Sequence, residues 1–163
     1  MNKFENFPGH SKVWIYQSNR DITETEVQGL LLIGQRFVDQ WKSHGAPVNG
    51  AIDILYNRFV IFVAEDNGEI GGCSIDSSVG VIRKFQEDLN VDFLSRMNLA
   101  FLDGEDLCVL HISKLNDAVK AGTLASETVV FDNTVVNIGE FRERWMVSLS
   151  KSWAWSRVEA IAG

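Results

Sequence analysis

The stretch from Phe59 to Ala64 constrains the fold most, because every one of its residues is apolar. A strand with apolar side chains on both faces is typical of the centre of a sheet, where both faces are covered. The preceding stretch, Gly50 to Tyr56, predicts a neighbouring strand. Val13 to Gln17 alternates Val and Ile with Trp and Tyr, which predicts a third strand with two different faces. These three stretches therefore predict a sheet in the first part of the chain.

A capping box predicts where the first long helix begins. Thr23 is followed three residues later by Glu26, and in this motif each side chain accepts a hydrogen bond from the other residue's backbone N–H. Apolar residues then recur at helical spacing as far as Lys42, and the sequence 44–47 supplies residues that end a helix. We expect a helix from about Glu24 to Lys42.

The remaining stretches predict hairpins and short helices rather than crossovers. Turn residues divide them into hairpins at 99–112 and 128–136 and short helices at 91–97, 113–121 and 140–145. Hairpin connections favour an α+β fold, with a mixed or mainly antiparallel sheet and about four helices packed on it. With two prolines and no Gly/Ser-rich linker, we expect one domain over 1–163, in which 1–11 is a flexible segment.

Charge and cysteine usage exclude several classes of function. The net charge is −7, and the longest basic cluster is Arg83-Lys84, so binding to nucleic acid or to an anionic membrane is not expected. The longest apolar run is too short to span a membrane, and residues 1–12 lack the apolar core of a signal peptide. Two cysteines do not make a disulfide framework, which favours a cytoplasmic protein. No cofactor is indicated.

One segment between an expected strand and an expected helix concentrates small polar residues. It contains Gly71, Gly72, Cys73, Ser74, Asp76, Ser77 and Ser78. Glycines free the backbone, a helix start offers N–H groups, and serines add hydroxyl donors. This combination suits a small anion or polar molecule. Trp14, Tyr16 and His44 are candidates for the rim of such a site. Alternatively, Asp76 or Ser77 caps the helix, and these residues only satisfy its start.

Cys73 supports a second hypothesis, a thiol-dependent enzyme or redox sensor. A helix start stabilises a thiolate, whereas a nearby carboxylate such as that of Asp76 opposes it. His44 or His111 would have to approach Cys73 to serve as its base. The alternative is a small residue packed at the end of a strand. No metal site is predicted, because Cys73 and Cys108 lie far apart and no Cys-x-x-Cys is present.

The tail contains a third candidate, the pair Trp153 and Trp155. In a strand these rings would share one face and, if exposed, could anchor a protein partner or a second copy of the chain. The alternative is that the tail folds back and buries them.

Several blocks of the sequence resemble an uncharacterised family of small bacterial proteins. The blocks are 13–17 (VWIYQ), 41–45 (WKSHG), 72–79 (GCSIDSSV) and 145–153 (WMVSLSKSW). The resemblance covers nearly the whole chain. Members of the family often carry the label "ABC transporter ATPase", but the resemblance implies no mechanism.

The residues themselves argue against ATPase activity. An ABC ATPase needs the phosphate-binding loop Gly-x-x-x-x-Gly-Lys-Ser/Thr, and the chain has no such string. The stretch 59–66 is similar to a Walker B strand only because apolar residues precede an acid, as in any central strand that runs into a turn.

Overall fold

The computed structural model describes residues 3–43, 45–65 and 72–158, with the backbone alone over 72–76. Backbone packing divides the chain into two compact units. Unit 1 comprises 1–95 and 136–139, and unit 2 comprises 96–135 and 140–163. The α+β class is confirmed, since the described residues form four α-helices and every named strand pairs antiparallel. The strands form separate sheets rather than one.

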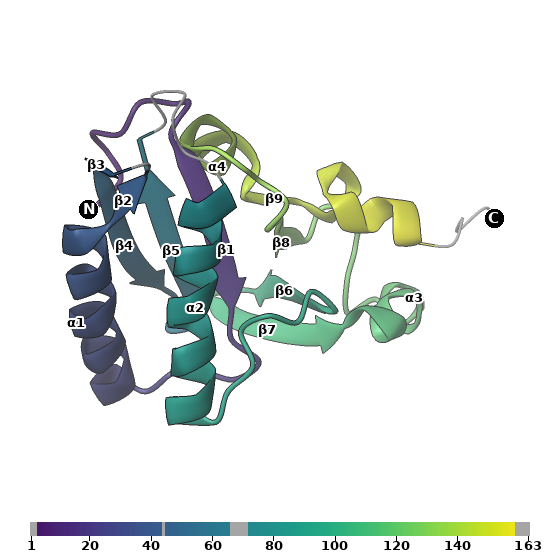
Figure 1. Ribbon diagram of the computed structural model, residues 1–163. Coiled ribbons are helices and arrows are strands. Elements are labelled where there is room, and N and C mark those ends of the chain that lie inside the picture. Colours follow the sequence, from purple (N-terminus) through teal and green to yellow (C-terminus); the bar gives the residue numbers. More distant parts are fainter. Residues whose placement is uncertain (1–2, 44, 66–71, 159–163) are drawn as a thin grey trace. The chain divides into compact units, whose positions relative to one another are not determined.

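Unit 1 is built on an antiparallel sheet with the order β1-β5-β4 (Figure 1). Its strands are β1 (Lys12–Gln17), β4 (Gly50–Leu55) and β5 (Phe59–Ala64). All residues of β5 are buried, as its apolar sequence predicts for a central strand. A small hairpin of β2 (Lys42–Ser43) and β3 (Ala46–Pro47) follows the first helix.

Two long helices lie side by side against the sheet of unit 1 (Figure 1). They are α1 (Glu24–Gln40) and α2 (Gly72–Leu89). A core of apolar side chains includes Val27 and Leu30 from α1, Ile82 and Phe85 from α2, and Phe62 from β5. The alternation of β5 thus places one set of its side chains against the helices.

Two further segments of unit 1 pack around its sheet. Phe4 is buried, and Lys3 reaches the outer edge of β4, where its Nζ donates to the carbonyl of Ile52 at 3.4 Å. On the other side, Val13 N–H donates to the carbonyl of Val136 at 3.1 Å, so the segment 136–138 runs along β1. Both edges of this sheet therefore have neighbours.

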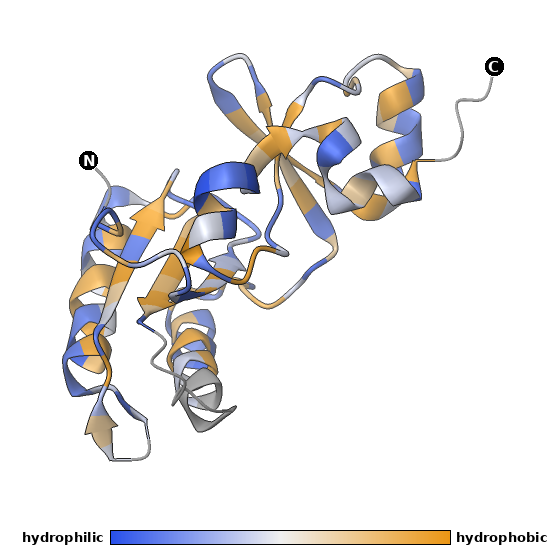
Figure 2. Ribbon diagram, turned by 90° about the horizontal axis from the view of Figure 1, so that it is seen from above, coloured by the Kyte–Doolittle hydropathy of each residue, from blue (hydrophilic) through white to orange (hydrophobic). Residues whose placement is uncertain are grey.

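Unit 2 contains a four-stranded antiparallel sheet with the order β7-β6-β8-β9. Its strands are β6 (Asn98–Asp103), β7 (Asp106–His111), β8 (Val129–Phe131) and β9 (Met146–Ser148). The helices are α3 (Leu115–Lys120), α4 (Ile138–Arg144), which begins in unit 1, and the 3₁₀ turns η1 (Ile112–Lys114), η2 (Leu149–Lys151) and η3 (Trp153–Arg157). Its core combines sheet residues such as Leu99 and Val130 with Leu115 and Leu149. In Figure 2 the strands are mainly hydrophobic, and hydrophilic residues gather on helices and turns.

The hairpin expected over 128–136 is wrong. β8 pairs instead with β6 and β9, and the backbone N–H of Asp132 donates to the carbonyl of Trp145 at 2.6 Å. The Asp132 carboxylate accepts from Thr134 N–H at 3.0 Å, which turns the chain away from the sheet. The sequence showed the turn but not which strand would pair with β8.

The short helix expected at 91–97 is wrong as well. The Asp92 carboxylate accepts from the backbone N–H groups of Leu94 and Ser95, and Phe93 N–H donates to the Gln86 side chain. These local bonds replace a helical ladder. None of the helices in the described part of the chain combines the length and apolar character that a membrane span requires.

Candidate functional site

The start of α1 is closed, in the sense that side chains at this helix start make hydrogen bonds with its backbone, as the capping box predicts. Thr23 Oγ1 accepts from Glu26 N–H at 3.2 Å, and Glu26 Oε1 accepts from Thr23 N–H at 2.9 Å. Arg20 donates to both carboxylate oxygens of Glu26 at 2.9 Å each. These bonds, those from Arg20 first and those from Thr23 second, lower the pKa of Glu26 to about 2. The same pairing raises the pKa of Arg20.

The end of α2 is closed by the same arginine. Arg20 Nη2 donates to the carbonyl of Leu89 at 3.0 Å, and Asn90 follows with φ of 52°, the left-handed conformation common after a helix. A cation at this end also complements the helix dipole. Arg20 thus joins the start of α1 to the end of α2.

The start of α2 differs from the sequence-based expectation. The helix begins at Gly72, so Asp76 and Ser77 lie inside it, and neither can be its N-cap. The expectation placed the helix start too late because Asp and Ser are common caps, whereas Gly72 and Cys73 carry no such signal. The first turn of α2 holds no acidic residue. The residue before it in the sequence is Gly71, which has no side chain with which to cap a helix.

Ser78 belongs to the core rather than to a ligand site. It is fully buried, and its Oγ lies 3.1 Å from the hydroxyl of Tyr16 on β1. Tyr16 is itself buried in the core of unit 1, away from any rim. Their hydrogen bond fixes α2 against the sheet. Ser77, one residue earlier, is exposed.

The other residues proposed from the sequence are only partly described. Gly71 and His44 lie outside the described residues, as do the side chains of Cys73, Ser74 and Asp76, although the backbone places these three in α2. Trp14 is half-buried and lies against Trp41, with ring centroids 5.5 Å apart.

Trp41 provides a buried donor that sequence reasoning missed. The side chain is 3% exposed, and its Nε1 has no hydrogen-bond partner among the described residues. Its ring contacts Phe62, near the end of β5 from which the chain leads to α2, and β2, which follows Trp41 directly, contacts α2. A buried N–H group without an acceptor is rare in proteins and destabilising. The sequence marked Trp41 only as a core residue.

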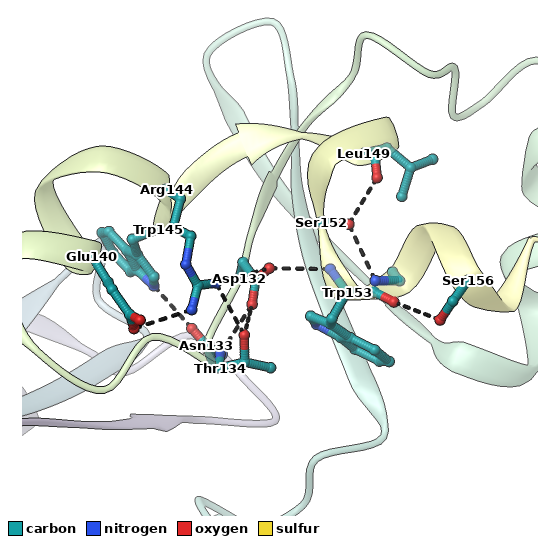
Figure 3. Close-up of polar contacts among 11 residues, drawn as sticks. Asp132, Asn133, Thr134, Glu140, Arg144, Trp145, Leu149, Ser152, Trp153 and Ser156 are labelled. Carbon is teal, nitrogen blue, oxygen red and sulfur yellow. Dashed lines mark hydrogen bonds and ion pairs between the residues drawn. The ribbon is translucent and has the colours of Figure 1, made fainter.

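Unit 2 contains a separate polar cluster around Asp132 (Figure 3). This buried carboxylate accepts from Trp153 N–H at 3.1 Å and lies 3.5 Å from Arg144 Nη1. Arg144 also pairs with Glu140 at 3.1 Å and donates to Thr134 Oγ1 at 3.2 Å. Because the Asp132 carboxylate bonds the backbone of Trp153, the cluster anchors the tail of the chain.

The tryptophan pair of the tail is only partly exposed. Trp153 is half-buried against the core of unit 2, and Trp155 is 37% exposed. Both lie in η3, a 3₁₀ helix, in which residues two apart do not share a face.

Neither a thiol site nor a metal site is evident among the described residues. Cys108 is free and half-buried on β7. His111 Nδ1 accepts from Ser113 N–H at 3.2 Å and caps η1. No group of metal-ligating side chains occurs in the described part of the chain.

No protein-family model matches the chain, and neither does any curated protein or solved structure. The resemblance to the small bacterial family therefore stays a prediction.

Proposed function

We propose that unit 1 is a binding module for a small anionic or polar molecule at the start of α2. The observation that carries the proposal is the first turn of this 18-residue helix, which holds no acidic residue and follows a glycine in the sequence. The first backbone N–H groups of a helix have no partner within it, and the dipole adds a partial positive charge. Such a helix start can bind an anion directly.

Neighbouring groups narrow the chemistry of the ligand. The sequence of the first turns of α2 contains Ser74 and Ser77, which carry hydroxyl groups, and the indole N–H of Trp41 is a further donor at the same end of unit 1. Ser78 is excluded, because its hydroxyl is hydrogen-bonded in the core. Asp76 adds a negative charge one turn into the helix, which disfavours multiply charged anions. We therefore favour a singly charged or polar molecule with several acceptor oxygens.

Inorganic phosphate at mildly acidic pH, where it is mainly the singly charged dihydrogen phosphate, is a suitable first probe, with binding measured by calorimetry. Ser74→Glu places a carboxylate in the first turn of α2, where it occupies the free N–H groups itself, and we expect phosphate binding to be lost. Gly80→Glu is the matched control: it adds the same charge to the same helix, about 12 Å from Gly72 along the axis, at an exposed position where a Cβ meets no neighbour. Equal affinity in the wild type and in Ser74→Glu would contradict the proposal.

A thiol function for Cys73 is the second candidate, because the structure places this residue in the first turn of α2. The helix dipole lowers the pKa of a thiol there, and a reducing cytoplasm would keep the thiol free. The pH dependence of alkylation in a Cys108→Ser background tests it. A midpoint below the ~8.5 of a free thiol supports the candidate, and a midpoint at or above that value rejects it.

A further inference from the structure

The outer edges of the two larger sheets differ in how they are protected. β1 carries the segment 136–138, and Lys3 places its ammonium on the edge of β4. β9 has only three residues. Covering segments, lysines and short strands are the devices that prevent sheet edges from pairing with another chain. The fourth edge, β7, shows none of them among the residues that the structure describes.

β7 presents a regular, apolar edge. It has six residues, its four inner positions 107–110 are apolar or Cys, and it contains no proline and no lysine. It pairs with β6 along its whole length on one side, and no described strand pairs with its other side (Figure 1).

The hydrogen bonds of the β6–β7 ladder determine which backbone groups point outward. Ile112 N–H donates to the carbonyl of Met97, and the pairing continues without a bulge from His111 to Asp106. Because hydrogen-bonded and non-hydrogen-bonded pairs alternate in an antiparallel ladder, Leu107, Val109 and His111 direct their N–H and C=O groups away from β6. These three residues form the free edge.

We propose that β7 pairs antiparallel with β7 of a second copy of this chain. Two residues can lie opposite each other in an antiparallel ladder only if the backbone N–H and C=O groups of both point toward the partner strand or those of both point away from it. The two-fold axis must therefore pass through a residue of β7, not between two residues. This leaves few registers, of which those centred on Cys108 and on Val109 use most of the strand.

Side-chain chemistry selects the register centred on Cys108. It places Leu107 opposite Val109 of the second copy, an apolar pair that occurs twice by symmetry. Glu105 belongs to the turn before β7 and takes no part in the ladder. The register centred on Val109 instead places Leu107 opposite the polar His111 of the second copy. Cross-strand apolar pairs stabilise sheets. The resulting dimer has a continuous eight-stranded sheet made of the two four-stranded sheets.

Sedimentation of the full chain over a wide range of concentration tests the pairing. We expect a monomer–dimer equilibrium that Val109→Lys shifts at least tenfold toward the monomer, because it places a lysine on the free edge. Met146→Lys is the matched control: it adds the same charge to an exposed residue on the opposite edge of the same sheet and should leave the equilibrium unchanged. Circular dichroism of both variants verifies that they fold. A wild type that stays monomeric at all concentrations would overturn the proposal.

Amide hydrogen exchange gives a second readout that does not depend on any variant. In an isolated chain the outward amides of Leu107, Val109 and His111 exchange fast, whereas the inward amides of Cys108 and Leu110 are protected by β6. We expect the outward amides to become protected as the protein concentration rises. A dimer in which they stay unprotected would show that another surface forms it.

Cross-linking tests the register. Opposite residues at a non-hydrogen-bonded antiparallel position have Cα atoms about 4.5 Å apart, within the range that a disulfide spans. In a Cys73→Ser background, mild oxidation should therefore join two chains through Cys108. A dimer that forms without this cross-link contradicts the register centred on Cys108.

Discussion

The two long helices of unit 1 pack in the same core and are nearly equal in length, with 17 residues in α1 and 18 in α2, yet they begin in opposite ways. α1 starts with two acidic residues in its first turn and a reciprocal capping box, to which Arg20 adds a bidentate ion pair. α2 starts with Gly72, Cys73 and Ser74 and has no acid in its first turn. The comparison shows that side chains of this fold cap the start of α1, whereas the first turn of α2 contains no acidic residue that could do the same.

Glu26→Gln should have the largest effect on the closed helix start. We expect the free energy of unfolding to fall by about 2 kcal/mol at neutral pH, because the carboxylate bonds both Arg20 and the Thr23 N–H. The side chain of Glu26 is 21% exposed, so only part of its pKa difference appears as stability.

The same variant has a defined pH dependence. The pKa of Glu26 is lowered from 4.5 to about 2 in the folded protein, so its contribution is complete above the higher value and is lost as the pH falls through the lower one. Urea unfolding of both proteins from neutral pH to about pH 2 should show the two stability curves converging. Parallel curves would show that Glu26 does not carry this stability.

Thr23→Ala and Ser77→Ala compare the two helix starts directly. Loss of the Thr23 cap should lower the free energy of unfolding by about 1 kcal/mol. Ser77 is an exposed residue inside α2, so its substitution should change stability by less than about 0.5 kcal/mol. Equal losses would mean that Ser77 caps α2 and that this helix starts later than Gly72.

Tyr16 and Ser78 form a pair whose coupling tests the structural role of Ser78. We expect a double-mutant cycle of Tyr16→Phe and Ser78→Ala to give a coupling energy of about 0.5–1 kcal/mol, since the two hydroxyls meet in the core at 3.1 Å. Phosphate affinity should be the same in Ser78→Ala and in the wild type. A weaker phosphate affinity in Ser78→Ala would show that Ser78 takes part in ligand binding.

Ser74→Glu should have a small effect on stability, opposite in sign to the effects of Glu26→Gln and Thr23→Ala. An acid in the first turn of α2 complements the dipole and should raise the free energy of unfolding by about 0.5 kcal/mol. Thermal unfolding of the variant and the wild type checks the sign. Destabilisation by Ser74→Glu would show that the start of α2 is already closed.

The sequence predicted the parts of the fold that depend on local signals. Thr23 and Glu26 marked the start of α1 correctly, and the apolar stretch of β5 marked the central strand. The partner of β8 could not be predicted, because its pairing with β6 and β9 depends on residues far along the chain.

The candidate site was predictable only as a segment. The start of α2 at Gly72 has no capping residue to mark it, and sequence patterns locate helix starts mainly by their caps. In the sequence Ser78 resembles the other small polar residues of this segment, whereas in the structure it is buried and bonded to Tyr16. The indole donor of Trp41 became visible only when its surroundings could be searched for an acceptor.

A phosphate titration followed by amide chemical shifts tests the central claim most directly, because it reads both helix starts in one sample. The account predicts saturable shifts for the amides of residues 72–75 and no comparable shifts for the first amides of α1, where Thr23 and Glu26 are already bonded to each other. Equal shifts at both helix starts, or none at 72–75, would contradict it.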